Sequence, residues 1–328
     1  MSQANCKHIL EHEDNVWKCC YNNSGTKLCS VTSSGLLYIW SVRVKTPSHS
    51  IVEAHASKCI QGLDVSRHLD VIATAATDQL VKIFNFDGRQ LLEFKGHGNV
   101  IEHVAFSNTR LNWIASCSKD RTVKLWNVGD QLRRVNVRRD HRSRIPIKKN
   151  LFGVVEKYFP PPLRTLRGHN HWVFHCVFSP DDTLLASASS DQEVRLWDPR
   201  EGDLLWVLTG HTGIVWSCSF LSRHAPIIDV VDSDSPTNDR ALVINASYEP
   251  SEQDVALVTC SSDRRLRFWS LCTGQILSEV KDPTREFDGR GQLLTLAVNK
   301  DASYVAVGSF GGNVTVLETS NFVTLRAS

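Results

Sequence analysis

The stretch that decides the fold runs from Gly168 to Asp198 and reads GHNHWVFHCVFSPDDTLLASASSDQEVRLWD. It opens with a Gly-His pair, continues through a short apolar run and a Ser-Pro-Asp-Asp turn, and closes on an alternating run that ends at Trp197. Short runs of β-forming residues separated by turn residues are typical of antiparallel strands. Leu204 to Leu208 supplies one more run. The stretch therefore predicts a small four-stranded sheet.

The same pattern recurs along the chain. A histidine precedes an acid or its substitute by 22 or 23 residues in the first four copies and by 52 in the fifth, which carries an insertion. A sixth copy, residues 304–317, is degenerate. The aromatic residues that close the β-like runs in the first five copies are Trp40, Phe84, Trp126, Trp197 and Trp269. Repeats of this length without a helical period predict the blades of a β-propeller.

At these residues the chain resembles the WD40-repeat family. The Gly-His and Trp-Asp signatures of that family stand here as Gly168-His169 with Trp197-Asp198, and as Gly210-His211 with Trp269. The resemblance covers about residues 8–325 and implies an all-β propeller with six detectable four-stranded blades, in which a seventh blade is absent or incomplete. We expect one domain over residues 1–328. Residues 321–325, where a next blade would start, and 8–10, which would complete the last blade, leave the closure of the ring open.

The resemblance also implies a structural role for the recurring polar residues. In the family, hydrogen bonds connect the strand Trp to a Ser or Thr, then to the His and then to the Asp. A Ser-His-Asp set also suggests a hydrolytic triad, but a set repeated at fixed spacing favours structure over catalysis, and we expect no enzyme. The second blade keeps Thr74, His55 and Asp78 beside Phe84, and the first lacks the Asp. The complete chains are Trp126-Ser116-His97-Asp120, Trp197-Ser187-His169-Asp191 and Trp269-Thr259-His211-Asp263.

Composition and short motifs exclude several classes of protein. The formal net charge is +2, and no apolar run reaches the 18 residues that a membrane-spanning helix needs. The first residues lack the apolar core of a secretory signal. Ten cysteines without a CxxC motif are typical of reduced thiols, so we expect a cytoplasmic or nuclear protein. No phosphate loop, dinucleotide fingerprint or HExxH motif occurs, so we expect no cofactor and no metal; His169, His171 and His175 form a weak metal alternative.

The residues that we expect to bind a partner follow the histidines. In the resembled family, the residue five positions after each histidine faces the narrow top face of the propeller. We predict that these side chains bind a peptide or a partner domain, since aromatic anchors dominate interfaces. The alternative is that they only plug the central channel. The predicted residues are Trp17, Glu102, Phe174 and Trp216, with Gln61 as the second-blade equivalent and Trp172 and Lys119 beside them.

Two insertions carry opposite charge. Residues 130–167, after blade three, have a net charge of +8, and residues 221–254, within blade five, have a net charge of −5. The basic insertion is a candidate binding site for phosphate or RNA, although a solvated loop without a partner is the simpler interpretation. Nucleic acid is therefore a less favoured partner than protein. The basic residues considered are Arg138, Arg139, Arg142, Arg144, Lys148 and Lys149.

One further motif lies at the end of the deciding stretch. Trp197-Asp198-Pro199-Arg200 resembles the WDxR box of substrate receptors for cullin-4 ubiquitin ligases, in which the Arg contacts the ligase adaptor. Only the Arg goes beyond the ordinary repeat pattern. Arg200 is therefore a candidate adaptor contact in an alternative function, and membership of a multiprotein complex is compatible with either.

Overall fold

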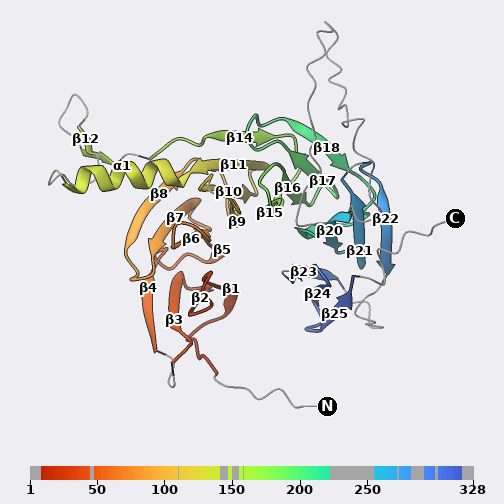
Figure 1. Ribbon diagram of the computed structural model, residues 1–328, viewed down its shortest axis with the longest axis horizontal. Coiled ribbons are helices and arrows are strands. Elements are labelled where there is room, and N and C mark those ends of the chain that lie inside the picture. Colours follow the sequence, from red (N-terminus) through yellow and green to blue (C-terminus); the bar gives the residue numbers. More distant parts are fainter. Residues whose placement is uncertain are drawn as a thin grey trace, which may run out of the picture. The chain divides into compact units, whose positions relative to one another are not determined.

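The structure is a computed structural model that describes residues 9–44, 48–109, 111–140, 147–149, 155–157, 159–221, 255–271, 273–281, 292–299 and 302–319. The chain divides into two compact units. The first unit holds Met1–Asp120 with Lys124–Leu163, and the second holds Arg121–Val123 with Arg164–Ser328. Antiparallel sheets build both units (Figure 1). The prediction of an all-β propeller fold with six detectable blades is confirmed.

The first unit contains the first two blades and most of the third. Blades one and two are four-stranded sheets in sequential order, and three strands of blade three follow them. The strands are β1 (Val16–Tyr21), β2 (Lys27–Thr32), β3 (Leu36–Ser41) and β4 (Ser48–Glu53); β5 (Ile60–Val65), β6 (Val71–Ala76), β7 (Leu80–Asn85) and β8 (Gln90–Lys95); and β9 (Ile101–Phe106), β10 (Trp113–Ser118) and β11 (Thr122–Asn127).

The second unit contains the remaining blades. The strand β14 (Arg164–Arg167) completes the third sheet, whose order is β14-β11-β10-β9. Blades four and five are again four-stranded and sequential. Their strands are β15 (Val173–Phe178), β16 (Leu185–Ser189), β17 (Val194–Trp197) and β18 (Leu204–Leu208), then β19 (Val215–Phe220), β20 (Val255–Ser261), β21 (Arg265–Ser270) and β22 (Ile276–Lys281).

The sixth blade departs from the prediction of four strands. It has three among the described residues: β23 (Leu293–Val298), β24 (Tyr304–Ser309) and β25 (Val314–Glu318). Its outermost strand exposes 72% of Val314 and 63% of Val316. The expected closing segment 321–325 lies outside the described residues, as does His8, and the described Ile9 and Leu10 belong to no strand.

The core forms between blades because a single sheet has two faces to cover. In blade four every residue of β16 is buried, and its small side chains at Ala186, Ser187 and Ala188 leave room for close packing. The apolar cluster around them continues into blade five through Val215 and Trp269. The predicted Trp–Ser/Thr–His–Asp chains lie at such packed faces.

One helix corrects the expectation that no helical period occurs. The helix α1 (Val128–Asp140) starts the basic insertion and lies beside β8 and β10 of the first unit (Figure 1). The Asn127 side chain accepts the Asp130 N–H at 2.9 Å and caps the helix. Buried Val128 and, one turn later, Leu132 pack on the core. The helix was missed because only this narrow apolar stripe interrupts a polar run.

The remaining insertions are described in part. A short pair of strands, β12 (Ile147–Lys149) and β13 (Val155–Lys157), lies within the basic insertion. The acidic insertion falls outside the described residues beyond Leu221, which is itself buried. Among the described residues no helix is long and apolar enough to span a membrane.

Candidate functional site

A β-bulge interrupts the first strand of every blade at the same position. In blade four, Val173 pairs with Ser189 and His175 pairs with Ala188, so that Phe174 between them is left unpaired. A bulge of this kind turns a side chain out of the regular alternation of the strand. The six residues at this position are Trp17, Gln61, Glu102, Phe174, Trp216 and Leu294.

The turn between the second and third strands meets each bulge. In blade four the N–H of Ser190 donates to the carbonyl of Trp172 at 2.9 Å, and in blade five the N–H of Ser262 donates to the carbonyl of Ile214 at 2.9 Å. The other four blades make the same bond, so the bulge and the turn define one end of each sheet. We call this the bulge end of a blade. It holds every residue that we predicted to face the top of the propeller.

The bulge end of the second unit gathers aromatic side chains. The rings of Phe174 and Trp216 lie 4.4 Å apart between centroids, and those of Trp172 and Phe174 lie 6.3 Å apart, edge to face. Trp172 is 42% exposed, whereas Phe174 and Trp216 are half-buried. The indole Nε1 of Trp216 is buried without a hydrogen-bond partner among the described residues. The three aromatic residues predicted here therefore form one cluster.

The bulge end of the first unit is more polar. Trp17 is 54% exposed. Glu102 and Lys119 form an ion pair of 3.0 Å, and the amide of Gln61 donates to the Cys59 thiol at 3.6 Å. The structure thus brings together Glu102 and Lys119, two of the residues predicted to face the top.

Sequence reasoning missed two residues of blade six. Leu294 is the bulge residue of that blade, and Phe310, 68% exposed, stands at the turn position that Lys119 holds in blade three. The missing marker was the Asp, which is replaced by Gly311. Alignment of the two strand runs on either side of the turn was the signal that would have identified both residues.

The polar chains are formed as the resemblance implied. In blade three the indole of Trp126 donates to Ser116 at 2.9 Å, while His97 lies 2.8 Å from Ser116 and 2.8 Å from Asp120. Because the Ser hydroxyl accepts from the indole, it donates its own proton to Nε2, and the His then donates from Nδ1 to the carboxylate. Blades four and five repeat this arrangement through His169 and His211.

The pKa values agree with neutral histidines and charged acids. Burial lowers the pKa of His55, His97 and His211, against the opposing effect of the acid beside each. Burial alone would raise the pKa of Asp191 and Asp263, but the bond and the charge of the histidine, together with two backbone N–H bonds, outweigh it and bring each pKa to about 2.

The incomplete chains are also as expected. In blade one, His12 lies 2.6 Å from Ser30, which accepts from Trp40 at 2.9 Å, and no Asp follows. In blade two, His55 lies 2.8 Å from Thr74 and 2.7 Å from Asp78, but the side chain of Phe84 has no N–H to donate.

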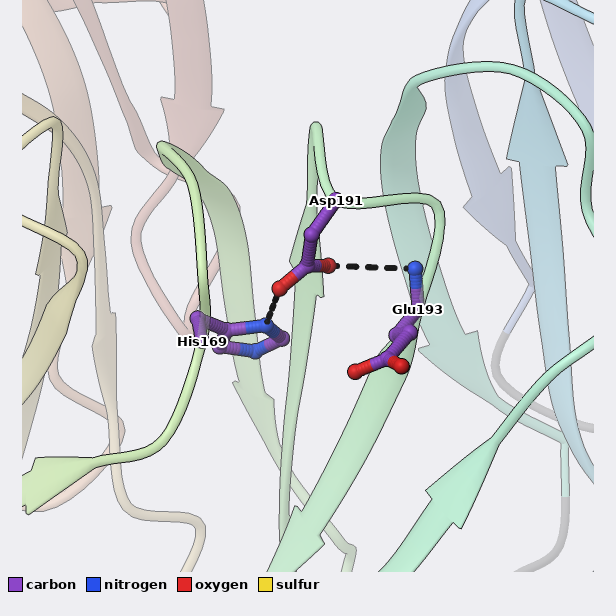
Figure 2. Close-up of side chains that lie close together, drawn as sticks. All are labelled: His169, Asp191 and Glu193. Atoms are coloured by element: carbon purple, nitrogen blue, oxygen red, sulfur yellow. Dashed lines mark hydrogen bonds and ion pairs between the residues drawn. The ribbon is translucent and has the colours of Figure 1, made fainter.

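His169, Asp191 and Glu193 form one group with the spacing of a metal site, their ligand atoms lying within 4.8 Å of one another. Figure 2 shows that Asp191 bridges the ring of His169 and the backbone N–H of Glu193. The Glu193 carboxylate is ion-paired with Arg195 at 2.8 Å. These bonds account for the group as part of the blade. The weaker set with His171 and His175 is not assembled, since His171 bonds Ser190 and His175 lies 3.7 Å from the Cys218 sulfur.

The remaining predicted residues lie away from the bulge ends. Arg200 is exposed on the turn between β17 and β18, where the Asp198 side chain accepts the Arg200 N–H at 2.7 Å. Arg138 and Arg139 lie in the last turns of α1, and Lys148 and Lys149 lie on β12. Arg142 and Arg144 fall outside the described residues.

Comparison with known proteins gives matches over most of these blades. The family model "WD domain, G-beta repeat" matches residues 4–41, 88–127, 160–198 and 202–270, more than half of the chain. The nuclear distribution protein nudF 1 of Talaromyces marneffei is 29% identical over 173 residues, 52% of this chain and 31% of the relative. Pre-mRNA-processing factor 19 of Oryza sativa subsp. japonica is 22% identical over 303 residues, 78% of this chain and 54% of the relative.

A third relative is the WD repeat and SOCS box-containing protein 1 of Xenopus tropicalis. It is 27% identical over 129 residues, 39% of this chain and 24% of the relative. The chain therefore spans between about a quarter and about half of the length of these three relatives.

Proposed function

The chain belongs to the WD40-repeat family, and on that premise we propose that it is a non-enzymatic interaction scaffold that binds a peptide or a partner domain at the bulge ends of its blades. The observation that carries this proposal is the repeated bulge, which places Trp17, Phe174 and Trp216 outside the strand pairing. Large aromatic side chains kept out of the core and partly exposed are typical of binding hot spots.

The polar chains support a scaffold over an enzyme. In blades three to five each histidine is buried and bonded on both ring nitrogens, and each Ser or Thr accepts an indole N–H. A general base needs a free nitrogen within reach of a substrate proton. The repetition of the set in successive blades favours a role in holding the blades together.

The test compares two triple variants of the full chain. Replacement of Trp17, Phe174 and Trp216 by Ala is expected to abolish capture of the partner in quantitative affinity purification. The matched control replaces Ile51, Leu204 and Ile276, exposed apolar residues of the outer strands, and should leave capture unchanged. A partner that is retained by the first variant would overturn binding at the bulge ends.

The exposure of Arg200 supports a second candidate function, a substrate receptor of a cullin-4-type ubiquitin ligase. Asp198 folds the turn, so the motif leaves only the Arg200 side chain to contact an adaptor. Arg200→Ala should then remove a copurifying adaptor without affecting other partners. Unchanged copurification would reject this candidate.

We also expect the cytoplasm or the nucleus as the compartment. The eight cysteines of the described residues are all free thiols, which supports a reducing environment. Fluorescence microscopy of the tagged protein tests this expectation.

A further inference from the structure

The bulge residues differ in character between the two units. The second unit has Phe174, Trp216 and Leu294 at this position, whereas the first unit has the polar Gln61 and Glu102 beside Trp17. Because β15 lies beside β19 and β19 beside β23, the three apolar residues form one row. The exposed Trp172 and Phe310 extend the apolar surface at the same end of blades four and six.

Trp216 adds a specific polar requirement to this surface. The indole groups of Trp126, Trp197 and Trp269 each donate a hydrogen bond of 2.8 or 2.9 Å within their own blade. The Nε1 of Trp216 is buried and makes none with the described residues. A buried donor without an acceptor costs free energy, so the surface is complementary to a ligand that brings an acceptor to this atom.

Two arginines lie on turns at the bulge ends. The exposed Arg121 and Arg264 occupy the same turn position of their blades and belong to the second unit. The acids of the turns in blades four and five are already engaged: Asp191 accepts from His169 and the Asn170 N–H, and Asp263 accepts from His211 and the Thr212 N–H. Because both arginine residues are exposed, a partner that reaches these turns meets positive charge.

Resting on the proposed function, we infer that the bulge end of blades four to six binds an acidic peptide segment with an aromatic or large aliphatic anchor. The anchor packs on Phe174 and Trp172, and an acceptor of the peptide takes the Trp216 N–H. Its carboxylates face Arg264 and also Arg121, which lies on the blade-three turn and belongs to the same unit. A single-stranded nucleic acid would also stack on aromatic rings, but it needs a longer basic track for its phosphates than two arginines provide.

The experiment pans a phage-displayed random peptide library on the full chain. We expect selection of Phe, Trp or Leu flanked by Asp and Glu. The highest-affinity peptide is then synthesised with a fluorophore and titrated by anisotropy. Phe174→Ala should weaken binding about thirty-fold through loss of the anchor contact. Trp216→Phe keeps a ring and removes only the donor, so about a five-fold loss is expected.

A charge variant and a matched control complete the set. Arg264→Gln should weaken binding about three-fold at low ionic strength and have a smaller effect at high salt. Arg89→Gln removes an exposed arginine from the turn between β7 and β8, at the opposite end of blade two, and should leave the affinity unchanged. Thermal unfolding of each variant by circular dichroism identifies any loss of fold before binding is compared.

Three results would overturn the inference: selection of peptides rich in Lys and Arg, selection of none, or tighter binding of an oligouridine competitor than of any peptide. Equal affinity of wild type and Phe174→Ala would do the same. If the triple variant nevertheless loses its cellular partner, the proposed function stands and only the chemistry assigned to that partner is wrong.

Discussion

The histidines of the blades sit in a fixed order of donors and acceptors. Trp126 donates to Ser116, Ser116 donates to His97, and His97 donates to Asp120, which leaves the ring neutral with its proton on Nδ1. Every polar group of the chain is satisfied only when all members are present. Removal of a middle member should therefore cost more than removal of an end.

The first prediction compares an end with a middle. Trp126→Phe imitates the natural Phe84 of blade two and removes only the terminal donor and part of the ring, so the free energy of unfolding should fall by about 1–2 kcal/mol. His97→Ala leaves Ser116 and Asp120 without their shared partner and should lower the free energy of unfolding by about 3 kcal/mol or more. Urea unfolding of both variants measures the difference. Equal losses would contradict the donor order.

The second prediction concerns pH. The pKa values of His55, His97 and His211 are lowered in the folded state. The unfolded chain therefore binds more protons just below pH 6.5, the ordinary pKa of histidine, and stability falls as the pH drops through this window. Asp191 and Asp263 have a pKa of about 2 in the folded state, so they add a further loss of stability as the pH falls below 3.8. The urea concentration at the midpoint of unfolding should therefore fall when the pH is lowered from about 7 to about 5.

One buried acid opposes this trend and supplies the control. Asp64 accepts the Phe106 N–H at 2.6 Å and the Val65 N–H at 2.8 Å, but burial prevails and raises its pKa to about 6. Its stabilising contribution is present at low pH and is lost as the pH rises through 6. Asp64→Asn should therefore make the acid loss steeper. A midpoint that is flat between pH 7 and 5 in both proteins would rule out this histidine titration.

At the scale of the element, the turn between the second and third strands has one conformation throughout. The residue after the Asp position has a positive φ in all six blades, 88° at Gly35 and 87° at Gly312, and between 63° and 73° at Gln79, Arg121, Gln192 and Arg264. Left-handed backbone is strained for residues with a Cβ. Four blades therefore hold a side chain where glycine would be favoured.

The third prediction reverses the residue type at this position. Gln192→Gly should raise the free energy of unfolding by about 0.5–1 kcal/mol, because it relieves the left-handed strain. Gly35→Ala should lower it, since the added Cβ would meet the His55 and Lys58 carbonyl oxygens at 2.8 and 2.9 Å. Urea unfolding of both variants checks the pair. A loss of stability in Gln192→Gly would show that its side chain contributes more than the strain costs.

Much of each blade followed from the sequence because strand runs and turn residues repeat at constant spacing. The deciding stretch predicted short β runs separated by turn residues, with the last run ending at Trp197, and the structure has β15, β16 and β17 there. The bulge at Phe174 could not be read directly, since one extra residue leaves no compositional mark. The helix α1 was missed for a related reason, because its cap and its two apolar contacts depend on tertiary packing.

At the scale of the whole molecule, the sixth blade differs from the others. Five sheets have four strands, whereas β25 ends the sixth among the described residues and exposes Val314 and Val316. An edge strand of this kind presents unpaired backbone groups. The degenerate repeat at 304–317 indicated that this blade would depart from the repeat pattern. The number of its strands did not follow from composition.

The fourth prediction uses hydrogen exchange. The amides of β25 that do not bond β24 should exchange at least ten-fold faster than the corresponding amides of β21, which bond β22. Mass spectrometry of peptides from both strands makes the comparison within one sample. Comparable protection of the two strands would mean that a further segment pairs with β25.

The bulges have a consequence for how such a molecule diversifies. A residue that takes no part in the backbone ladder changes without disturbing the register on either side. The six positions already hold two tryptophans, a phenylalanine, a leucine, a glutamine and a glutamate on nearly identical sheets. Ligand preference is thereby separated from folding, so that new specificities become accessible by single substitutions that leave the framework intact.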